Sequence, residues 1–236
     1  MFKTEGSKMT NTNNTAVGTA RKVNSKSIAT LGMLCAIAFV AKLISNIFPV
    51  VAGFLSFDLK DVVIVIGGFI SGPLAALAIT VVVSLIEMLT ISSTGIIGFV
   101  MNVLASCAFA CIASVIYHRD RSMKGAIIGL ASGVLCMTAI MILWNWLITP
   151  LYMHVSRATV VKMLIPTFLP FNLVKGGINA TLAMLLYKPV VTALRRAHLV
   201  PESSGRGRTT KLGVVIISVI LLATFVLLAL VLAKVI

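Results

Sequence analysis

Acidic residues are scarce in this chain of 236 residues. Six Asp and Glu stand against 20 Lys and Arg, and charged residues make up only 11% of a sequence that is 59% hydrophobic. This composition excludes a soluble globule, a disordered protein and a secreted disulfide scaffold, and indicates an integral membrane protein. The net charge of +14 does not indicate nucleic-acid binding, because the basic residues lie mainly between apolar runs and report membrane orientation.

The sequence also lacks the motifs of several enzyme classes. It has no GxxxxGK[ST] loop, no HExxH and no GxSxG, so it offers no P-loop ATPase, zinc protease or serine hydrolase site. Cys107 and Cys111 share a helix face, but both lie in an apolar segment, which favours packing over a metal or redox role. Without an energy source or nucleophile, the chain is predicted to be a binder, a facilitator or one subunit of a larger assembly, with no metal and no cofactor.

Six apolar runs are long enough to cross a bilayer, which needs roughly 20 residues. They are residues 27–47, 62–91, 96–117, 125–150, 168–190 and 212–236. The second run would form a helix of about 45 Å, and Gly72-Pro73 offers a turn within it. A turn there places the N-terminal tail, the basic loop 118–124 and the basic stretch 188–211 together in the cytoplasm, as the positive-inside rule requires.

We therefore predict an all-α integral membrane protein with seven spans. It comprises a polar cytoplasmic tail (1–26), a six-helix substrate-binding membrane core (27–196), a polar basic linker (197–211) and an additional transmembrane helix (212–236). The second span, about 58–73, is short for a bilayer and must be shielded by its neighbours or lie beside a cavity. The additional helix is almost purely apolar and is predicted to face lipid.

Two loops are expected at the outer face. They cover residues 48–57 and 151–167, the second beginning where Pro150 is expected to close the fifth span. His154 and Arg157 in that second loop are most simply solvated, with attraction of an anionic ligand as the alternative.

Polar side chains inside spans are costly, so they mark candidate functional positions. Asn172 and Lys175 are spaced i, i+3 and share one face of the sixth span. Asn145 lies between Trp144 and Trp146 near the outer end of the fifth span and is expected at the same depth. Two amides, one ammonium group and nearby aromatics predict an outward-facing site for a flat, mostly neutral heterocycle.

Other polar positions keep two interpretations. Asp58 and Asp61 either cap the second span or serve function, and Glu87 is expected to neutralise a lysine rather than relay protons. Asn102 is expected to form an interhelical hydrogen bond. For Lys175, snorkelling or a structural ion pair is the alternative to ligand contact.

Small residues recur on the first span. Ala29, Gly32 and Ala36 follow an i, i+3, i+7 pattern, and the small-xxx-small pair Gly32 and Ala36 allows close approach of another helix. This face is a candidate docking surface for another membrane protein.

Four segments resemble a known family. Residues 54–61, 66–75, 144–146 and 169–176 are similar to the riboflavin-specific substrate-binding subunits (S components, RibU type) of energy-coupling factor (ECF) transporters, in a match that covers roughly 27–192. The Gly-Pro turn is shared by S components for several vitamins, whereas Pro-Phe-Asn-x-x-Lys-Gly is more specific for the flavin member.

The resemblance implies a six-helix S-component bundle in a bacterial cytoplasmic membrane, and here an appended seventh transmembrane helix follows it. Such a subunit is not an enzyme. It binds riboflavin on the extracellular side as transported ligand, docks on a transmembrane coupling subunit that carries two ATPases, and delivers its cargo inward. Its expected partners are riboflavin, those ECF subunits and membrane lipid, with no nucleic acid.

The resemblance also assigns residues. It places the polar flavin contacts at Asn145, Asn172 and Lys175, the coupling-subunit docking surface at Ala29, Gly32 and Ala36, and a ligand-covering loop at 54–58. The dimethylbenzene end of a flavin requires apolar surroundings. Side chains expected to bind the ligand beside the polar contacts are Phe54, Leu55, Phe57, Asp58, Trp144 and Trp146.

Three alternatives stay open at this level. The chain is otherwise an S component for another vitamin or a flavin analogue, a self-contained small-molecule permease or channel, or an intramembrane enzyme. The last is disfavoured because Asp58, Asp61 and Glu87 form no recognisable acid-base or metal constellation. The N-terminal tail and the additional helix lie outside the resemblance.

Overall fold

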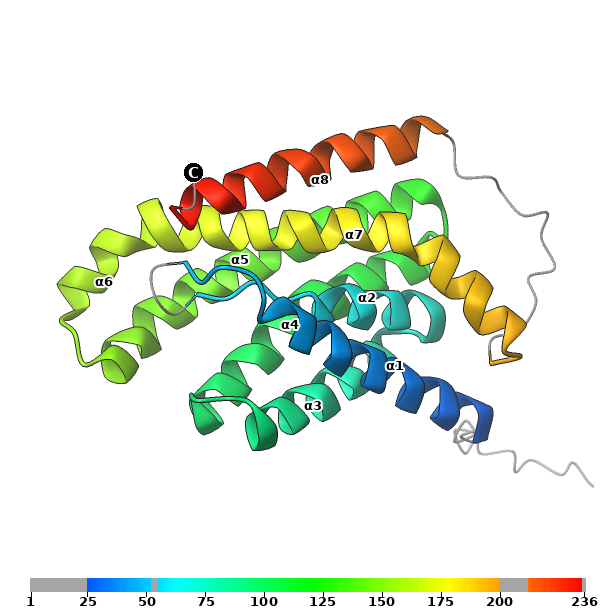
Figure 1. Cartoon of the computed structure of the whole chain (residues 1–236), viewed down its shortest axis with the longest axis horizontal. Coiled ribbons are helices and arrows are strands. Elements are labelled where there is room, and N and C mark those ends of the chain that lie inside the picture. The colour runs from blue at the N-terminus through cyan, green and yellow to red at the C-terminus, as the bar shows by residue number, and fades with distance from the viewer. Residues whose placement is uncertain (1–24, 52–54, 200–211, 235–236) are drawn as a thin grey trace, which may run out of the picture.

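The computed structural model describes residues 25–51, 55–199 and 212–234 and is built from helices (Figure 1). The helices are α1 (Ser25–Ser45), α2 (Lys60–Ser71), α3 (Pro73–Thr90), α4 (Gly95–Arg119), α5 (Met123–Met153), α6 (Arg157–Met163), the π-helix η1 (Leu164–Phe168), α7 (Leu169–Arg196) and α8 (Leu212–Leu232). Phe54 lies outside the described residues, as do residues 1–24 of the predicted tail and residues 200–211 of the predicted linker.

The predicted all-α membrane architecture is confirmed. Within the described residues, six helical segments are long and apolar enough to cross a bilayer, namely α1, α3, α4, α5, the continuous run α6 to α7, and α8. The predicted short span corresponds to α2, which has only 12 residues. It is shielded as a short span must be, because it packs against α1, α3, α4 and α7, and most of its residues are buried.

The predicted break at Gly72-Pro73 is also confirmed. Gly72 has φ +101°, a backbone conformation that glycine adopts without a steric penalty, and its N–H donates to the carbonyl of Gly68 at 2.8 Å. Pro73 then occupies the first turn of α3, where a missing N–H costs nothing. The chain therefore reverses direction after α2 and returns as α3.

The predicted outer loop 151–167 is wrong, because most of it is helical. Pro150 does not close α5, which continues to Met153 and ends where His154 adopts a left-handed conformation with φ 53°. A proline this close to the end of a helix removes only one hydrogen bond of the last turns. Ser156 then caps α6 by accepting the Thr159 N–H at 3.3 Å, and η1 joins α6 to α7 without a loop.

The helices are arranged so that α8 lies apart from α1. In Figure 1, α8 runs antiparallel along α7, while α1 crosses the opposite side of the molecule next to α2 and α3. Only Ser218 and Ala229 of the described residues of α8 are buried, and most of the others are exposed, as predicted for a lipid-facing helix that contacts the protein along one side.

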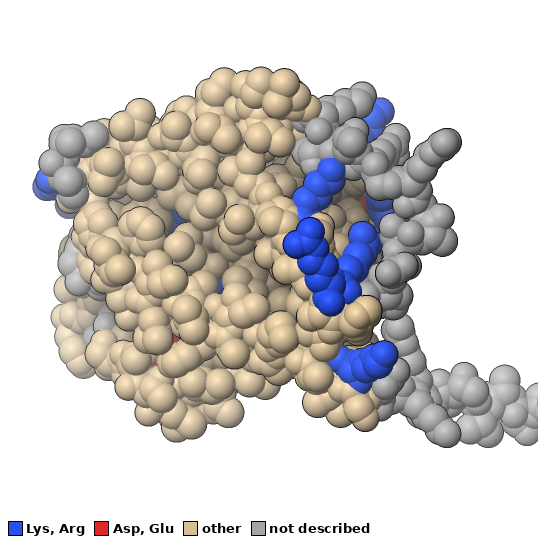
Figure 2. Space-filling view, turned by 45° about the vertical axis from the view of Figure 1, so that its right-hand side comes forward, with Lys and Arg blue, Asp and Glu red and all other residues tan. Residues whose placement is uncertain are grey.

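Basic side chains gather towards one end of the molecule. Figure 2 shows most of the visible Lys and Arg there, with uncharged surface over most of the rest of that face. Arg119 ends α4, and Arg195 and Arg196 end α7. The hydroxyls of Tyr117 and Tyr187 lie 3.1 Å apart and link these two helices.

Candidate ligand-binding site

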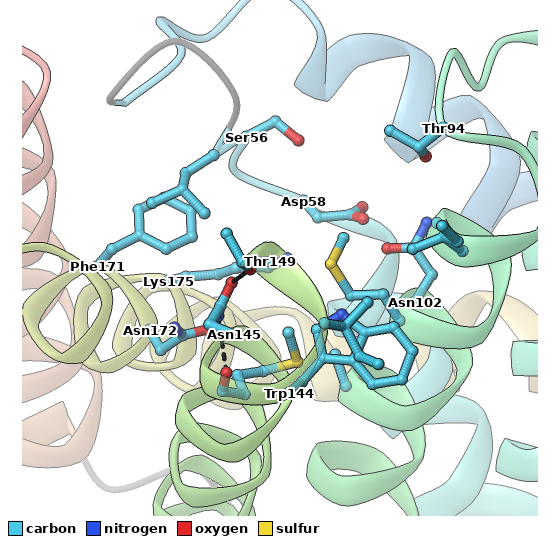
Figure 3. Close-up of a pocket in the computed structure, with 17 residues that line it drawn as sticks. Ser56, Asp58, Thr94, Asn102, Trp144, Asn145, Thr149, Phe171, Asn172 and Lys175 are labelled. Carbon is cyan, nitrogen blue, oxygen red and sulfur yellow. Dashed lines mark hydrogen bonds between the residues drawn. The ribbon is translucent and has the colours of Figure 1, made fainter. Parts of the chain in front are cut away.

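A pocket lies between the segment that precedes α2 and the helices α4, α5 and α7 (Figure 3). Its empty volume is about 830 Å³ when the open mouth is counted. Its lining consists of Leu55, Ser56, Asp58, Thr94, Ile97, Gly98, Met101, Asn102, Ala105, Met141, Trp144, Asn145, Ile148, Thr149, Phe171, Asn172 and Lys175.

Each helix presents one continuous face to the pocket. The residues that α5 contributes recur at intervals typical of a helix, from Met141 through Trp144 and Asn145 to Thr149. The residues of α4 follow the same repeat from Ile97 to Ala105. These side chains are therefore held in place by rigid helices rather than by a mobile loop.

Asn145 is held in a fixed orientation. Its Nδ2 donates to the backbone carbonyl of Met141 at 2.7 Å, and its Oδ1 accepts the hydroxyl of Thr149 at 2.8 Å. Both polar side chains are buried, and both contacts are drawn in Figure 3. An amide has two donor hydrogens and an acceptor oxygen with two lone pairs, so Asn145 keeps one hydrogen and one lone pair for a ligand.

Asn172 and Lys175 keep more of their hydrogen-bonding capacity than Asn145 does. The Nδ2 of Asn172 donates to the carbonyl of Phe168 at 2.8 Å, and its side-chain oxygen has no hydrogen bond among the described residues. Lys175 is half-buried and has neither a hydrogen bond nor an ion pair within 4.0 Å in the same part of the chain. Its charge acts on Asp58 and Asp61 at longer range. This side of the pocket therefore offers free donors and an acceptor.

A ring of buried charges adjoins the pocket. Lys42 lies 3.6 Å from Asp58 and 3.2 Å from Glu87, and Lys60 lies 3.0 Å from Asp58 and also pairs with Glu87. All four side chains are less than one-tenth exposed. The ring joins α1, α2 and α3, and it confirms the prediction that Glu87 neutralises a lysine.

The two acids at the start of α2 have different partners. Asp58 accepts the N–H of Lys60, two residues further along, at 3.3 Å, but it is not the cap of α2, which begins after Leu59 without a side-chain cap; Asp58 also belongs to the ring and lines the pocket. Asp61 lies in the first turn and accepts the hydroxyl of Ser106 on α4. Asp58 thus combines a place in the ring with a place on the pocket wall, whereas Asp61 ties α2 to α4.

Two aromatic residues expected at the ligand lie elsewhere. Phe57 is buried against Phe171, with ring centroids 5.2 Å apart, and supports the pocket from behind instead of lining it. Trp146 is 38% exposed, and the guanidinium of Arg157 lies 5.3 Å from the centroid of its ring. Since Trp144 and Asn145 face the pocket, a residue one or two positions further along the same helix turns away.

Several pocket residues were not expected from the sequence. Asn102 lines the pocket and makes no side-chain hydrogen bond among the described residues, so the interhelical bond expected of it is not found there. Thr94 and Thr149 are also in the lining. The signal for Asn102 was its amide inside an apolar span, and for Thr149 its position one turn after Asn145.

The small-residue face of α1 points away from the protein. Ala29, Gly32 and Ala36 are exposed, while Leu34 and Ala38 on the other side of α1 are fully buried. Among the described residues, no atom lies within 4 Å of the place where a Cβ of Gly32 would stand. This part of the face is therefore open.

The described residues offer no cluster of three or more His, Cys, Asp or Glu that could hold a metal ion. The thiol of Cys111 instead donates to the backbone carbonyl of Pro73 at 3.7 Å, a packing contact between α4 and α3. The polar groups of the pocket are amides, hydroxyls, an ammonium and a carboxylate, a set suited to hydrogen bonding with an organic molecule.

Comparison with protein families gives this architecture a name. The family model described as "ECF transporter, substrate-specific component" matches residues 26–187, which cover α1 to most of α7. The chain belongs to this family of S components. The prediction of a transport subunit rather than an enzyme is confirmed, since the similar curated proteins are transporters.

Two curated relatives of this S component are similar over nearly their whole length. "Riboflavin transporter FmnP" of Bacillus subtilis (strain 168) is 30% identical over 186 residues, covering 74% of this chain and 98% of that protein. "Riboflavin transporter RibU" of Staphylococcus aureus (strain TCH60) is 32% identical over 185 residues, covering 75% and 97%. This chain therefore has segments beyond what these relatives match.

A solved structure shares the fold of this S component. It is described as the S component of a bacterial ECF transporter, and it aligns with a TM-score of 0.60 and 31% identity, covering 72% of this chain and 97% of that one. Helix α8 lies outside the residues that the family model matches. It is an addition to the S-component core.

Proposed function

We propose that this S component captures riboflavin in the pocket between α4, α5 and α7 and delivers it inward when docked on an ATP-driven ECF module. The observation that carries the proposal is the convergence of Asn145, Asn172 and Lys175 on one pocket with hydrogen-bonding capacity still open. The names of the two relatives, at 30% and 32% identity, give the same ligand.

The chemistry of a flavin matches the lining. An isoalloxazine ring has a uracil-like edge of alternating acceptors with one N–H donor, and amide side chains both donate and accept. Asn145 and Asn172 can therefore bind that edge, while Lys175 donates to a ring oxygen or nitrogen. The dimethylbenzene end requires apolar contact, which Met101, Trp144 and other apolar side chains of the lining supply.

The charge of the pocket favours riboflavin over its mononucleotide. In the described part of the chain, Lys175 is the one cationic side chain of the lining, and Asp58 is its one carboxylate. Tight phosphate binding usually relies on arginine forks or several positive donors. A neutral flavin requires no such donors.

Docking is assigned to the exposed face of α1 defined by Ala29, Gly32 and Ala36. Small residues allow the backbones of two membrane helices to approach closely. Its occupant in this proposal is the transmembrane coupling subunit, which carries two ATPases. The basic ends of α4 and α7 support a cytoplasmic position for that end of the molecule and an extracellular mouth for the pocket.

Titration of the purified protein with riboflavin, followed by flavin fluorescence, tests the ligand. Saturable quenching near one flavin per chain, resistant to an excess of unrelated vitamins, is expected. Quenching abolished by another vitamin, or no quenching at all, would indicate that this S component binds a ligand other than riboflavin.

Uptake into liposomes tests whether the chain transports riboflavin by itself or only together with an ECF module. The chain alone is expected to bind riboflavin without concentrating it, and co-reconstitution with an ECF module and ATP is expected to give concentrative uptake. Uptake by the chain alone would indicate a self-contained permease.

A further inference from the structure

Helix α8 contacts the core at a position that has no side chain. A Cβ on Gly177 of α7 would lie 2.5 Å from the ring of Phe225 on α8, closer than real Cβ atoms approach other groups. The preceding residue, Gly176, faces α5 instead, where a Cβ would lie 2.8 Å from Val134. The paired glycines thus let α7 pack tightly against two different helices, one of them outside the S-component core.

The same part of α8 belongs to an apolar cluster that includes the pocket wall. Ala229 is buried in one cluster with Val51, Phe57 and Phe171, and Phe225 packs against that cluster. Phe171 lines the pocket, and so does Leu55, which packs against the cluster as well. One side of the cluster therefore borders the ligand site and the other side is α8.

The cluster also includes described residues of the segment that precedes α2. Val51 and Leu55 exchange two backbone hydrogen bonds, of 2.8 and 2.9 Å, which hold these two residues side by side. The side chains of Val51 and Phe57 are only 3% and 5% exposed. Removing the α8 side of the cluster would take away part of the van der Waals packing of its side chains, which is what holds apolar helices together where lipid is the solvent.

We infer that α8 is a positioning element for the ligand site, which holds Phe171 and the segment at Val51 and Leu55 against the pocket and so lengthens the time that a flavin stays bound. The inference rests on the proposed riboflavin-binding function. It gives a role to a helix that the family match does not include. The contact acts through the pocket wall, since no described residue of α8 lines the pocket.

The glycine contact allows a test in the full-length chain. Gly177→Ala inserts a methyl group where the Phe225 ring lies, and Phe225→Ala removes that ring. Both variants are expected to loosen α8 and to raise the rate of flavin dissociation about threefold or more, the scale of losing one or two ordered side chains. The rate is measured by dilution of the loaded protein and recovery of flavin fluorescence.

The double variant separates α8 from other effects of the substitution. In the Phe225→Ala background the methyl group added at position 177 has space, so Gly177→Ala is expected to cause no further increase in the dissociation rate. Leu227→Ala, at an exposed position of α8, is the matched control and is expected to leave the rate unchanged.

The possible results are distinguishable. Equal effects of Gly177→Ala in both backgrounds would show that the effect does not pass through α8 and would overturn the inference. Unchanged dissociation in both single variants, with riboflavin bound normally, would also overturn it. Failure of the parent chain to bind riboflavin would refute the proposed function itself, before any variant is compared.

Discussion

The two sides of the pocket differ in how their polar groups are partnered. On the side of α1 to α3, Asp58 is enclosed in a ring with Lys42, Lys60 and Glu87. On the side of α7, neither Lys175 nor the amide oxygen of Asn172 has a polar partner among the described residues. The first arrangement holds helices together, whereas the second leaves binding capacity for a ligand.

This difference separates stability from recognition. A buried charge without a partner is strongly destabilising, so every member of the ring depends on the others. A polar group that lines an open pocket can exchange a bound water for a ligand. Substitutions on the two sides should therefore affect different measurements.

The largest effect is expected in the ring. Lys60→Met leaves Asp58 and Glu87 with Lys42 as their shared partner within the ring, and breaking a buried pair in this way costs about 3 to 5 kcal/mol. Thermal denaturation in detergent should show the loss. The double variant Lys60→Met with Glu87→Gln restores the charge balance and should recover much of it, and a single variant as stable as the parent would show that the ring is not structural.

The second effect concerns α1, whose inner side carries Lys42 and whose outer side is open. Gly32→Trp and Ala36→Trp should abolish assembly with the coupling subunit and uptake, because bulk there prevents close helix approach. Flavin binding should be unchanged, since no described atom lies within 4 Å of a Cβ at Gly32. Co-purification and titration are compared, and lost flavin binding with intact assembly would contradict the assignment.

On the open side of the pocket, Asn172→Ala and Lys175→Ala should each weaken riboflavin binding by at least about 1 kcal/mol, the value of one buried hydrogen bond. That is roughly a fivefold rise in Kd. Lys175→Ala should lower the thermal stability far less than Lys60→Met does, because Lys175 acts on Asp58 and Asp61 only at longer range and forms no ion pair within 4.0 Å in the described part of the chain. Unchanged affinity in both variants would remove these residues from the site.

The smallest effect is expected at Trp146, which is not part of the lining. Its ring lies beside Arg157 and is partly exposed, so Trp146→Phe should change the free energy of riboflavin binding by less than about 0.5 kcal/mol. Trp144→Phe, on the pocket face of the same helix, is the matched comparison and should weaken binding more. Equal effects of the two substitutions would contradict the finding that only Trp144 faces the ligand.

Helix periodicity explains how much of the site could be predicted. The spacing of Asn172 and Lys175 on one helix, with an amide in a neighbouring one, was sufficient to predict that these groups share a pocket, because a helix fixes which residues share a face. Phe57 lies in an irregular segment, where spacing carries no such rule, and it packs behind the wall. The contribution of α4 was missed because a single amide marked an otherwise apolar face.

Features that depend on how helices pack against one another could not be predicted from the sequence. Glu87 was expected to pair with a lysine, but the closed ring with Lys42 and Lys60 follows from the packing of three helices. Pro150 indicated a helix end, yet a proline near the last turn is tolerated within α5. The partner of α8 depends on Gly177, which in the sequence is only one of two adjacent glycines.

The most direct test is a visible absorption spectrum of the purified protein, before and after denaturation, followed by titration with riboflavin. The expected result is a flavin spectrum, or its appearance on titration, at about one equivalent per chain, and its loss or weakening in Lys175→Ala. A colourless protein that does not take up added riboflavin would contradict the assignment of this pocket to a flavin.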